Sequence, residues 1–191
     1  MKREWLIPIV PPDPPLTERQ RVRRVAILCH HCLGNIACYR AGWKTGRLRL
    51  RVERQFWIGA NGAFLDIAVL EWCKLFTEYK GKHHWKAIIV DAAKFRKGLR
   101  AKLGLSGGEF EKYARTVLHY RDKFIAHLDD DLKMRPPIMW PARRSAAYLY
   151  DYLLSHPALA VHLDDFTHSA RDFYRFMYAH AYREHPVRRE A

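Results

Sequence analysis

From residue 17 onward, the apolar residues of this 191-residue chain recur at the three- and four-residue spacing of an amphipathic α-helix. The clearest run follows Thr17 and Gln20, which match a capping box, and it ends at Gly42. Its apolar positions are Val22, Val25, Ala26, Cys29, Cys32, Leu33 and Ile36. Such a helix must bury its apolar face against other helices, so the pattern predicts an all-α helical bundle.

Five later segments carry the same periodicity, which gives about six helices and no confident strand. The expected helices cover residues 65–79, 85–103, 107–128, 145–154 and 164–183. Gly81 and Gly104 stop the first two, and Gly98 is a weak point inside the second. A strand over residues 87–90 is the alternative there. Ser106 and Glu109 form a second capping box ahead of the 107–128 segment.

The chain divides into an arm, one domain and a tail. Five prolines fall within the first 15 residues, which favours an extended arm over residues 1–16. Residues 17–185 are expected to form a single domain, because 49% hydrophobic content supplies a sizeable core. Residues 186–191 follow Pro186 as a short tail.

The chain carries a formal net charge of +14, which makes a polyanionic partner a serious candidate. Charge alone leaves RNA, DNA and a membrane surface as alternatives. The sequence has no run of about 18 uncharged apolar residues and no apolar signal peptide after Met1. We therefore expect a soluble, cytoplasmic protein that does not bind a membrane, with its four cysteines reduced.

The stretch from Arg121 to His127 carries the clearest chemical signal. An arginine can hold a phosphate through its rigid fork of donors, and a histidine can move protons near neutral pH. Together they indicate phosphodiester chemistry without a metal or another cofactor. Arg121 also falls on the apolar stripe of its helix, so it needs an acidic partner, a ligand or another subunit.

Arg121, Asp122 and His127 match the motif of the HEPN superfamily, in which an arginine, a polar residue and a histidine lie on an all-helical domain. Residues 120–129, 64–67 and 72–76 resemble its abortive-infection branch, and the similarity runs from about Thr17 to about Tyr182. This resemblance implies a homodimeric, metal-independent ribonuclease that acts in phage defence or as a toxin, with an antitoxin or defence-system partner. It also allows degenerate members that only bind.

Residues six apart on a straight α-helix point about 120° from each other, with about 9 Å of axial rise, so Arg121 and His127 do not converge within one helix. In a twofold dimer, each Arg121 can approach the partner's His127. We hypothesise that His127 takes the proton of an RNA 2′-hydroxyl, that Arg121 binds the scissile phosphate, and that Asp122 orients its neighbours. The alternative is a non-catalytic module that binds nucleic acid or protein, with Arg121 and Asp122 holding the interface.

Other basic residues are candidates for contacts to RNA. Arg47, Arg49 and Arg51 alternate with apolar residues, which indicates a short strand or hairpin with a cationic row, or simply a solvated charged edge. His119 and Lys123 flank Arg121 and complete the predicted RNA-contacting set.

Three other clusters have a metal-binding interpretation. Residues 29–32 read Cys-His-His-Cys, but Cys29 and Cys32 lie on an apolar stripe, so no metal site is expected there. His83–His84 is interpreted as a polar helix entry or part of a phosphate-binding surface. Asp164–Asp165 is interpreted as a helix cap or a solvated pair, with Mg²⁺ binding as the alternative.

Overall fold

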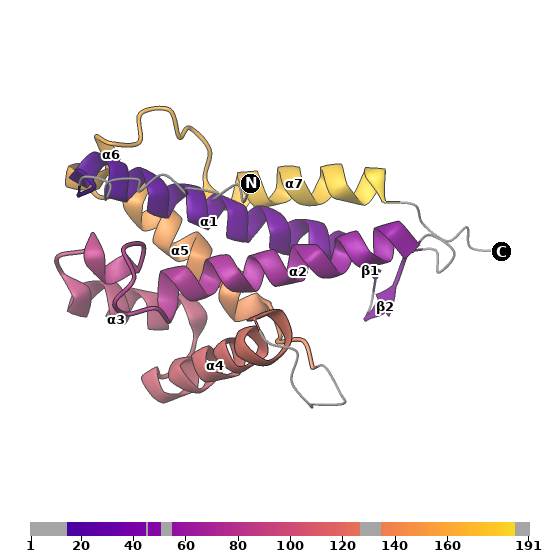
Figure 1. Ribbon diagram of the computed structural model, residues 1–191. Coiled ribbons are helices and arrows are strands. Elements are labelled where there is room, and N and C mark those ends of the chain that lie inside the picture. Colours follow the sequence, from indigo (N-terminus) through magenta and orange to yellow (C-terminus); the bar gives the residue numbers. More distant parts are fainter. Residues whose placement is uncertain (1–14, 45, 51–54, 127–134, 186–191) are drawn as a thin grey trace, which may run out of the picture.

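The computed structural model describes residues 15–44, 46–50, 55–126 and 135–185 (Figure 1). Its helices are α1 (Glu18–Ala41), α2 (Gln55–Phe76), α3 (Ala92–Leu103), α4 (Gly107–Tyr120), α5 (Trp140–Ser155), α6 (Pro157–Ala160) and α7 (Ala170–Glu184). A 3-10 turn, η1 (Trp85–Ala87), precedes α3, and a π-helical turn, η2 (Arg121–Ala126), continues α4. The expected all-α class is confirmed. Within the described ranges, no helix is both long and apolar enough to cross a bilayer.

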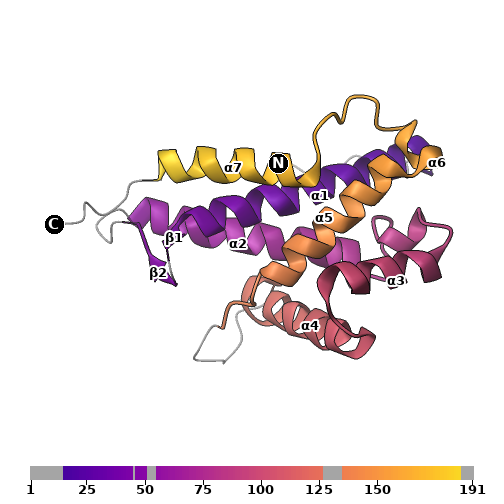
Figure 2. The same ribbon diagram turned by 180° about the vertical axis from the view of Figure 1, so that it is seen from behind.

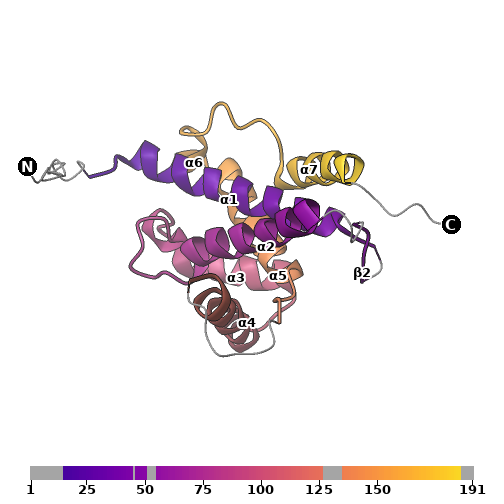
Figure 3. The same ribbon diagram turned by 45° about the vertical axis from the view of Figure 1, so that its right-hand side comes forward.

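The helices are arranged around a central pair. Helices α1 and α2 pack along each other, α7 runs along α1, and α4 lies against α2 on the opposite side (Figures 1 and 2). Helix α5 packs against both α1 and α3 and so connects the α1–α2 pair to α3. Figure 3 shows the same arrangement, with α7 and α4 far apart. Residues 1–14 of the expected arm and 186–191 of the expected tail lie outside the described residues.

Both capping boxes form as the sequence predicts. The Thr17 hydroxyl accepts from the backbone N–H of Gln20 at 3.2 Å, and the Gln20 side chain accepts from the Thr17 backbone at 3.0 Å. Ser106 and Glu109 repeat this reciprocal pair at the start of α4. Each box satisfies two backbone donors that a helix start leaves without partners, which fixes where α1 and α4 begin.

Other boundaries differ from the expected ones. Helix α2 starts ten residues earlier and ends at Phe76. The segment 85–103 forms neither one helix nor a strand over 87–90, because the Asp91 side chain accepts from the Lys94 backbone at 2.9 Å and caps α3. Helix α7 starts only at Ala170, since Ser169 caps it by accepting from the Asp172 backbone.

Gly98 serves close packing of α3 on α5. A Cβ atom at this position would collide with the hydroxyl oxygen of Tyr148 on α5. The glycine that we expected to weaken the helix therefore makes room for Tyr148 of α5.

The basic segment after α1 forms the hairpin that its alternation indicates. Strands β1 (Trp43–Lys44) and β2 (Arg47–Leu48) pair antiparallel, and Gly46 adopts φ 79° at the turn between them. This hairpin lies beside the start of α2 (Figure 1).

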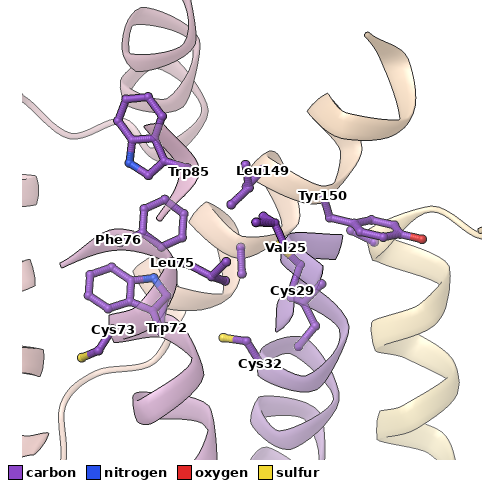
Figure 4. Close-up of a cluster of buried hydrophobic side chains, with 14 of the residues drawn as sticks. Val25, Cys29, Cys32, Trp72, Cys73, Leu75, Phe76, Trp85, Leu149 and Tyr150 are labelled. Carbon is purple, nitrogen blue, oxygen red and sulfur yellow. The ribbon is translucent and has the colours of Figure 1, made fainter. Parts of the chain in front are cut away.

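The core lies among α1, α2 and α5 (Figure 4). Trp72 is fully buried, and its indole Nε1 donates to the Ser145 hydroxyl at 2.8 Å. Cys29, Cys32 and Cys73 are buried free thiols beside it. The cysteines thus pack as small hydrophobic residues, as their place on the stripe indicates.

An ion pair joins α1 to the segment before α7. Arg23 Nη2 donates to Asp165 Oδ2 at 2.7 Å, and Asp164 lies 3.7 Å from the same guanidinium. The hydrogen bond from Arg23 lowers the pKa of Asp165 to about 2. Neither carboxylate caps a described helix, since both lie beside Arg23 of α1. Both side chains are exposed to solvent, which agrees with the interpretation as a solvated pair.

Candidate active site at the end of α4

Helix α4 changes character at the arginine of the predicted motif. Tyr120 ends the α-helix, and Arg121–Ala126 continues as a π-helical turn that packs against α2. The i→i+5 hydrogen bonding of a π-helix is rare and often found at functional sites. No residue pattern in the sequence distinguishes this turn from a continuing α-helix, so it was not expected.

The Arg121 guanidinium lies between two carboxylates. Nε and Nη2 lie 2.9 and 2.8 Å from Asp122 Oδ1, and Nη1 donates to Glu78 Oε1 at 2.9 Å. Asp122 is the next residue, whereas Glu78 follows the end of α2. The structure thus supplies the acidic partners that an arginine on an apolar stripe requires.

The site is partly open to solvent. The Arg121 side chain is 22% exposed, and those of Glu78 and Asp122 are 42% and 46% exposed. Partial burial lowers the pKa of Arg121. The hydrogen bond to Asp122 and the nearby carboxylates raise this pKa by more than burial lowers it, so the net shift is upward. Arg121 remains a cation that a ligand in solvent can reach.

The thiol nearest this cation is Cys73 on α2, whose side chain is buried. Burial raises the pKa of Cys73 to about 11, against a smaller opposing effect of Thr77 and Arg121. A thiolate is the nucleophilic form of cysteine. Cys73 is therefore a neutral packing residue near pH 7.

A second polar contact holds the end of α4 on α2. The Tyr120 hydroxyl donates to Asp66 Oδ1 at 3.1 Å. Burial raises the pKa of Asp66, while the hydrogen bond from Tyr120 partly offsets that rise. Tyr120 thus holds the end of α4 on α2, and Arg121 holds the start of η2 on the segment just after α2.

His127 lies outside the described residues and directly follows η2. The six residues Arg121–Ala126, which include the arginine and lead up to His127, form a π-helix. The straight-helix estimate of about 120° and 9 Å assumes α-helical pitch, so it does not apply to this segment.

The predicted RNA-contacting residues fall into different settings. Arg47 is exposed on β2, His119 is exposed in the last turn of α4, and Lys123 is half-buried on η2. Arg49 makes contacts within the chain: its guanidinium lies 3.4 Å from the centre of the Tyr182 ring and donates to the Ala41 carbonyl at 2.7 Å. Arg51 lies outside the described residues.

The described ranges contain no group of three or more His, Cys, Asp or Glu side chains placed to hold a metal ion. His84 is buried, and its Nδ1 accepts from the Lys86 backbone at 3.2 Å at the start of η1. Burial lowers its pKa to about 4, which keeps the ring neutral. His84 thus lies at the entry to a helical turn, which agrees with the first of its two interpretations.

Comparison with protein-family models, with curated proteins and with solved structures finds no match to this chain.

Proposed function

We propose that this protein is a metal-independent endoribonuclease of the HEPN type, active as a homodimer in phage defence or as a toxin. The observation that carries the proposal is the presentation of Arg121, a charged guanidinium fixed in orientation at a solvent-facing π-helical turn. A preoriented cation stabilises charge that develops on a phosphate without a reorganisation cost at the moment of reaction.

The contacts at Arg121 leave two of its N–H groups for a phosphate. A guanidinium has five N–H groups, and the contacts to Asp122 and Glu78 use three of them. Asp122 contacts two nitrogens, whereas Glu78 contacts only Nη1. A phosphate oxygen therefore displaces Glu78 more easily than Asp122, and Glu78 occupies the place of the substrate's charge.

In the proposed reaction, His127 removes the proton from the 2′-hydroxyl of the RNA, and the 2′-oxygen attacks the adjacent phosphorus. Arg121 stabilises the charge that develops on the non-bridging oxygens. The bond from phosphorus to the 5′-oxygen breaks, and the partner's His127 protonates that oxygen. The products are a 2′,3′-cyclic phosphate and a 5′-hydroxyl, and no step requires a metal ion.

The net charge of +14 supports a polyanionic substrate, because lysine and arginine contacts to phosphates supply most non-specific affinity for nucleic acid. The requirement for a 2′-hydroxyl selects RNA over DNA in this reaction. The antitoxin or defence-system partner follows only from the resemblance to the HEPN superfamily.

A second candidate function is a non-catalytic module that binds nucleic acid or protein. It is favoured by one observation: Arg121 pairs with Glu78, which follows α2, so its charge also serves to hold η2 against the end of α2. Variants separate the two functions. His127→Ala abolishes cleavage and keeps the fold and RNA binding if the protein is a nuclease, whereas a binding module shows no cleavage to abolish.

A further inference from the structure

A groove runs along one face of α4. Its first part is a pocket of about 200 Å³ between α3 and the start of α4. Its second part, of about 170 Å³, follows the side of α4 past Arg115 and Leu118. Tyr79 and Glu111 line both parts, so the two hollows adjoin each other. We call this feature the α4 groove.

The pocket of the α4 groove is cationic. Lys86, Arg96 and Arg100 line it, and no described residue forms an ion pair with any of the three. Of the described lining residues, Glu111 alone carries a carboxylate. Three cations against one carboxylate leave the pocket with an excess of positive charge that attracts an anion.

The cations stand beside aromatic rings. Lys86 Nζ lies 4.9 Å from the ring centre of Tyr79, and the Arg96 guanidinium lies 5.7 Å from that of Trp85. Trp85 is 5% exposed and forms part of the pocket wall, whereas Tyr79 is 64% exposed. An exposed ring next to unpaired cations fits a ligand that carries both a planar face and a phosphate.

The groove leads from this pocket toward the candidate active site. Thr77 and Tyr79 line its second part, and Glu78 between them contacts Arg121. Helix α4 has 14 residues and is therefore about 21 Å long. At about 3.4 Å per stacked nucleotide, about six nucleotides span this distance.

We propose that the α4 groove binds a single strand of RNA, with one base stacked on Tyr79 and its phosphate on Arg96 and Arg100. The placement of the scissile phosphate at Arg121 rests on the proposed ribonuclease function, but the pocket itself does not. Stacking on a ring tolerates any base, so this contact extends the binding site without adding sequence specificity.

The test is the affinity of full-length His127→Ala protein for labelled single-stranded RNA in EDTA, measured by fluorescence anisotropy at several salt concentrations. RNA of about ten nucleotides is compared with a trinucleotide, because only the longer strand spans α4. Arg96→Gln with Arg100→Gln removes two pocket charges. The matched control is Lys97→Gln with Lys102→Gln, which removes two exposed α3 charges outside the pocket lining.

We expect the pocket double variant to bind the longer RNA about tenfold more weakly, and the slope of log affinity against log salt to shrink by about 0.7, because one phosphate loses its contacts. Tyr79→Ala weakens the same RNA about tenfold. The trinucleotide, which fills the pocket but does not span α4, binds the unchanged protein more weakly than the longer RNA and loses affinity in the same variants. Glu111→Gln strengthens binding. Equal losses in the control variant, or no loss in the pocket variant, overturn the proposal.

A free nucleotide is the other source of the same chemistry. If adenosine monophosphate binds the pocket as tightly as the longer RNA does, the strand proposal is overturned in favour of a nucleotide site. Cleavage by the wild-type protein is measured separately. Pocket-dependent binding without cleavage contradicts only the ribonuclease function, and cleavage without pocket-dependent binding contradicts only the groove.

Discussion

Arg121 donates to Glu78 at 2.9 Å, although 43 positions separate the two residues in the chain. The contact joins the end of α2 to the π-helical turn after α4. It fixes the guanidinium and at the same time places a negative charge where the proposed phosphate binds. This combination makes Glu78 the residue whose replacement distinguishes a substrate site from a structural ion pair.

Glu78→Gln is expected to raise the affinity for RNA several-fold, because the amide keeps the side-chain shape and removes the charge that competes with phosphate. Stability should change by no more than about 1 kcal/mol, since both side chains are solvent-exposed in part. RNA binding is measured in the His127→Ala background, with Glu184→Gln on α7 as the control. Weaker binding in Glu78→Gln would mean that Glu78 positions Arg121 without competing with substrate.

Arg121→Lys is expected to lower kcat about a hundredfold or more, although it retains the positive charge. A lysine ammonium cannot reproduce the planar fork that contacts Asp122 and Glu78 at once, and loss of one such donor typically costs 10²–10³-fold. Arg171→Lys, an exposed change on α7, is the control. Single-turnover cleavage rates check this, and full activity in Arg121→Lys would exclude oriented phosphate stabilisation.

Ser145→Ala is expected to destabilise the fold by about 1–3 kcal/mol without a direct effect on the site. The change removes the acceptor of the Trp72 indole and leaves a buried N–H without a hydrogen bond. Urea unfolding measures the free energy of unfolding, and Ser155→Ala near the exposed end of α5 is the control. Equal free energies for Ser145→Ala and the wild type would show that the indole finds another partner.

The protein is expected to lose stability as pH falls from 6.5 toward about 4, because His30 stays neutral in the fold. Burial is the main cause that lowers its pKa to about 4, with help from His31 and His168. The unfolded chain binds a proton at about pH 6.5, so it takes up more protons than the folded chain in this window. The stability contributed by neutral His30 is present above pH 6.5 and is lost as pH falls.

The measurement is urea unfolding across that pH window. His30 stacks on Phe173 with ring centres 4.1 Å apart, so His30→Phe keeps the stacking and should flatten the pH dependence in part. Some pH dependence of the stability remains in this variant, because burial also lowers the pKa of His84 to about 4. An unchanged slope in His30→Phe would contradict the assignment.

The sequence predicts best what depends on neighbouring residues. Thr17 with Gln20 and Ser106 with Glu109 act within one helical turn, so both helix starts are correct. Contacts between distant segments leave no such local pattern. Nothing near Arg121 in the chain indicates Glu78, and nothing near Asp165 indicates Arg23, because packing of separate helices brings each pair together.

The same reason explains other contacts that the sequence does not reveal. Arg49 looks like part of an exposed cationic row, but its partner Tyr182 comes from α7. Gly98 is expected to weaken its helix, but a larger residue at this position would collide with Tyr148 of α5. The π-helical turn at Arg121 likewise has no signature in the residues that form it.

The most direct test of the ribonuclease function is cleavage of labelled RNA by the purified protein in EDTA, beside His127→Ala, Arg121→Ala and a DNA strand of the same sequence. The proposed function predicts RNA fragments that end in 2′,3′-cyclic phosphate, no DNA cleavage, and no cleavage by either variant. Cleavage of DNA, dependence on a divalent metal, or undiminished cleavage by His127→Ala would contradict it.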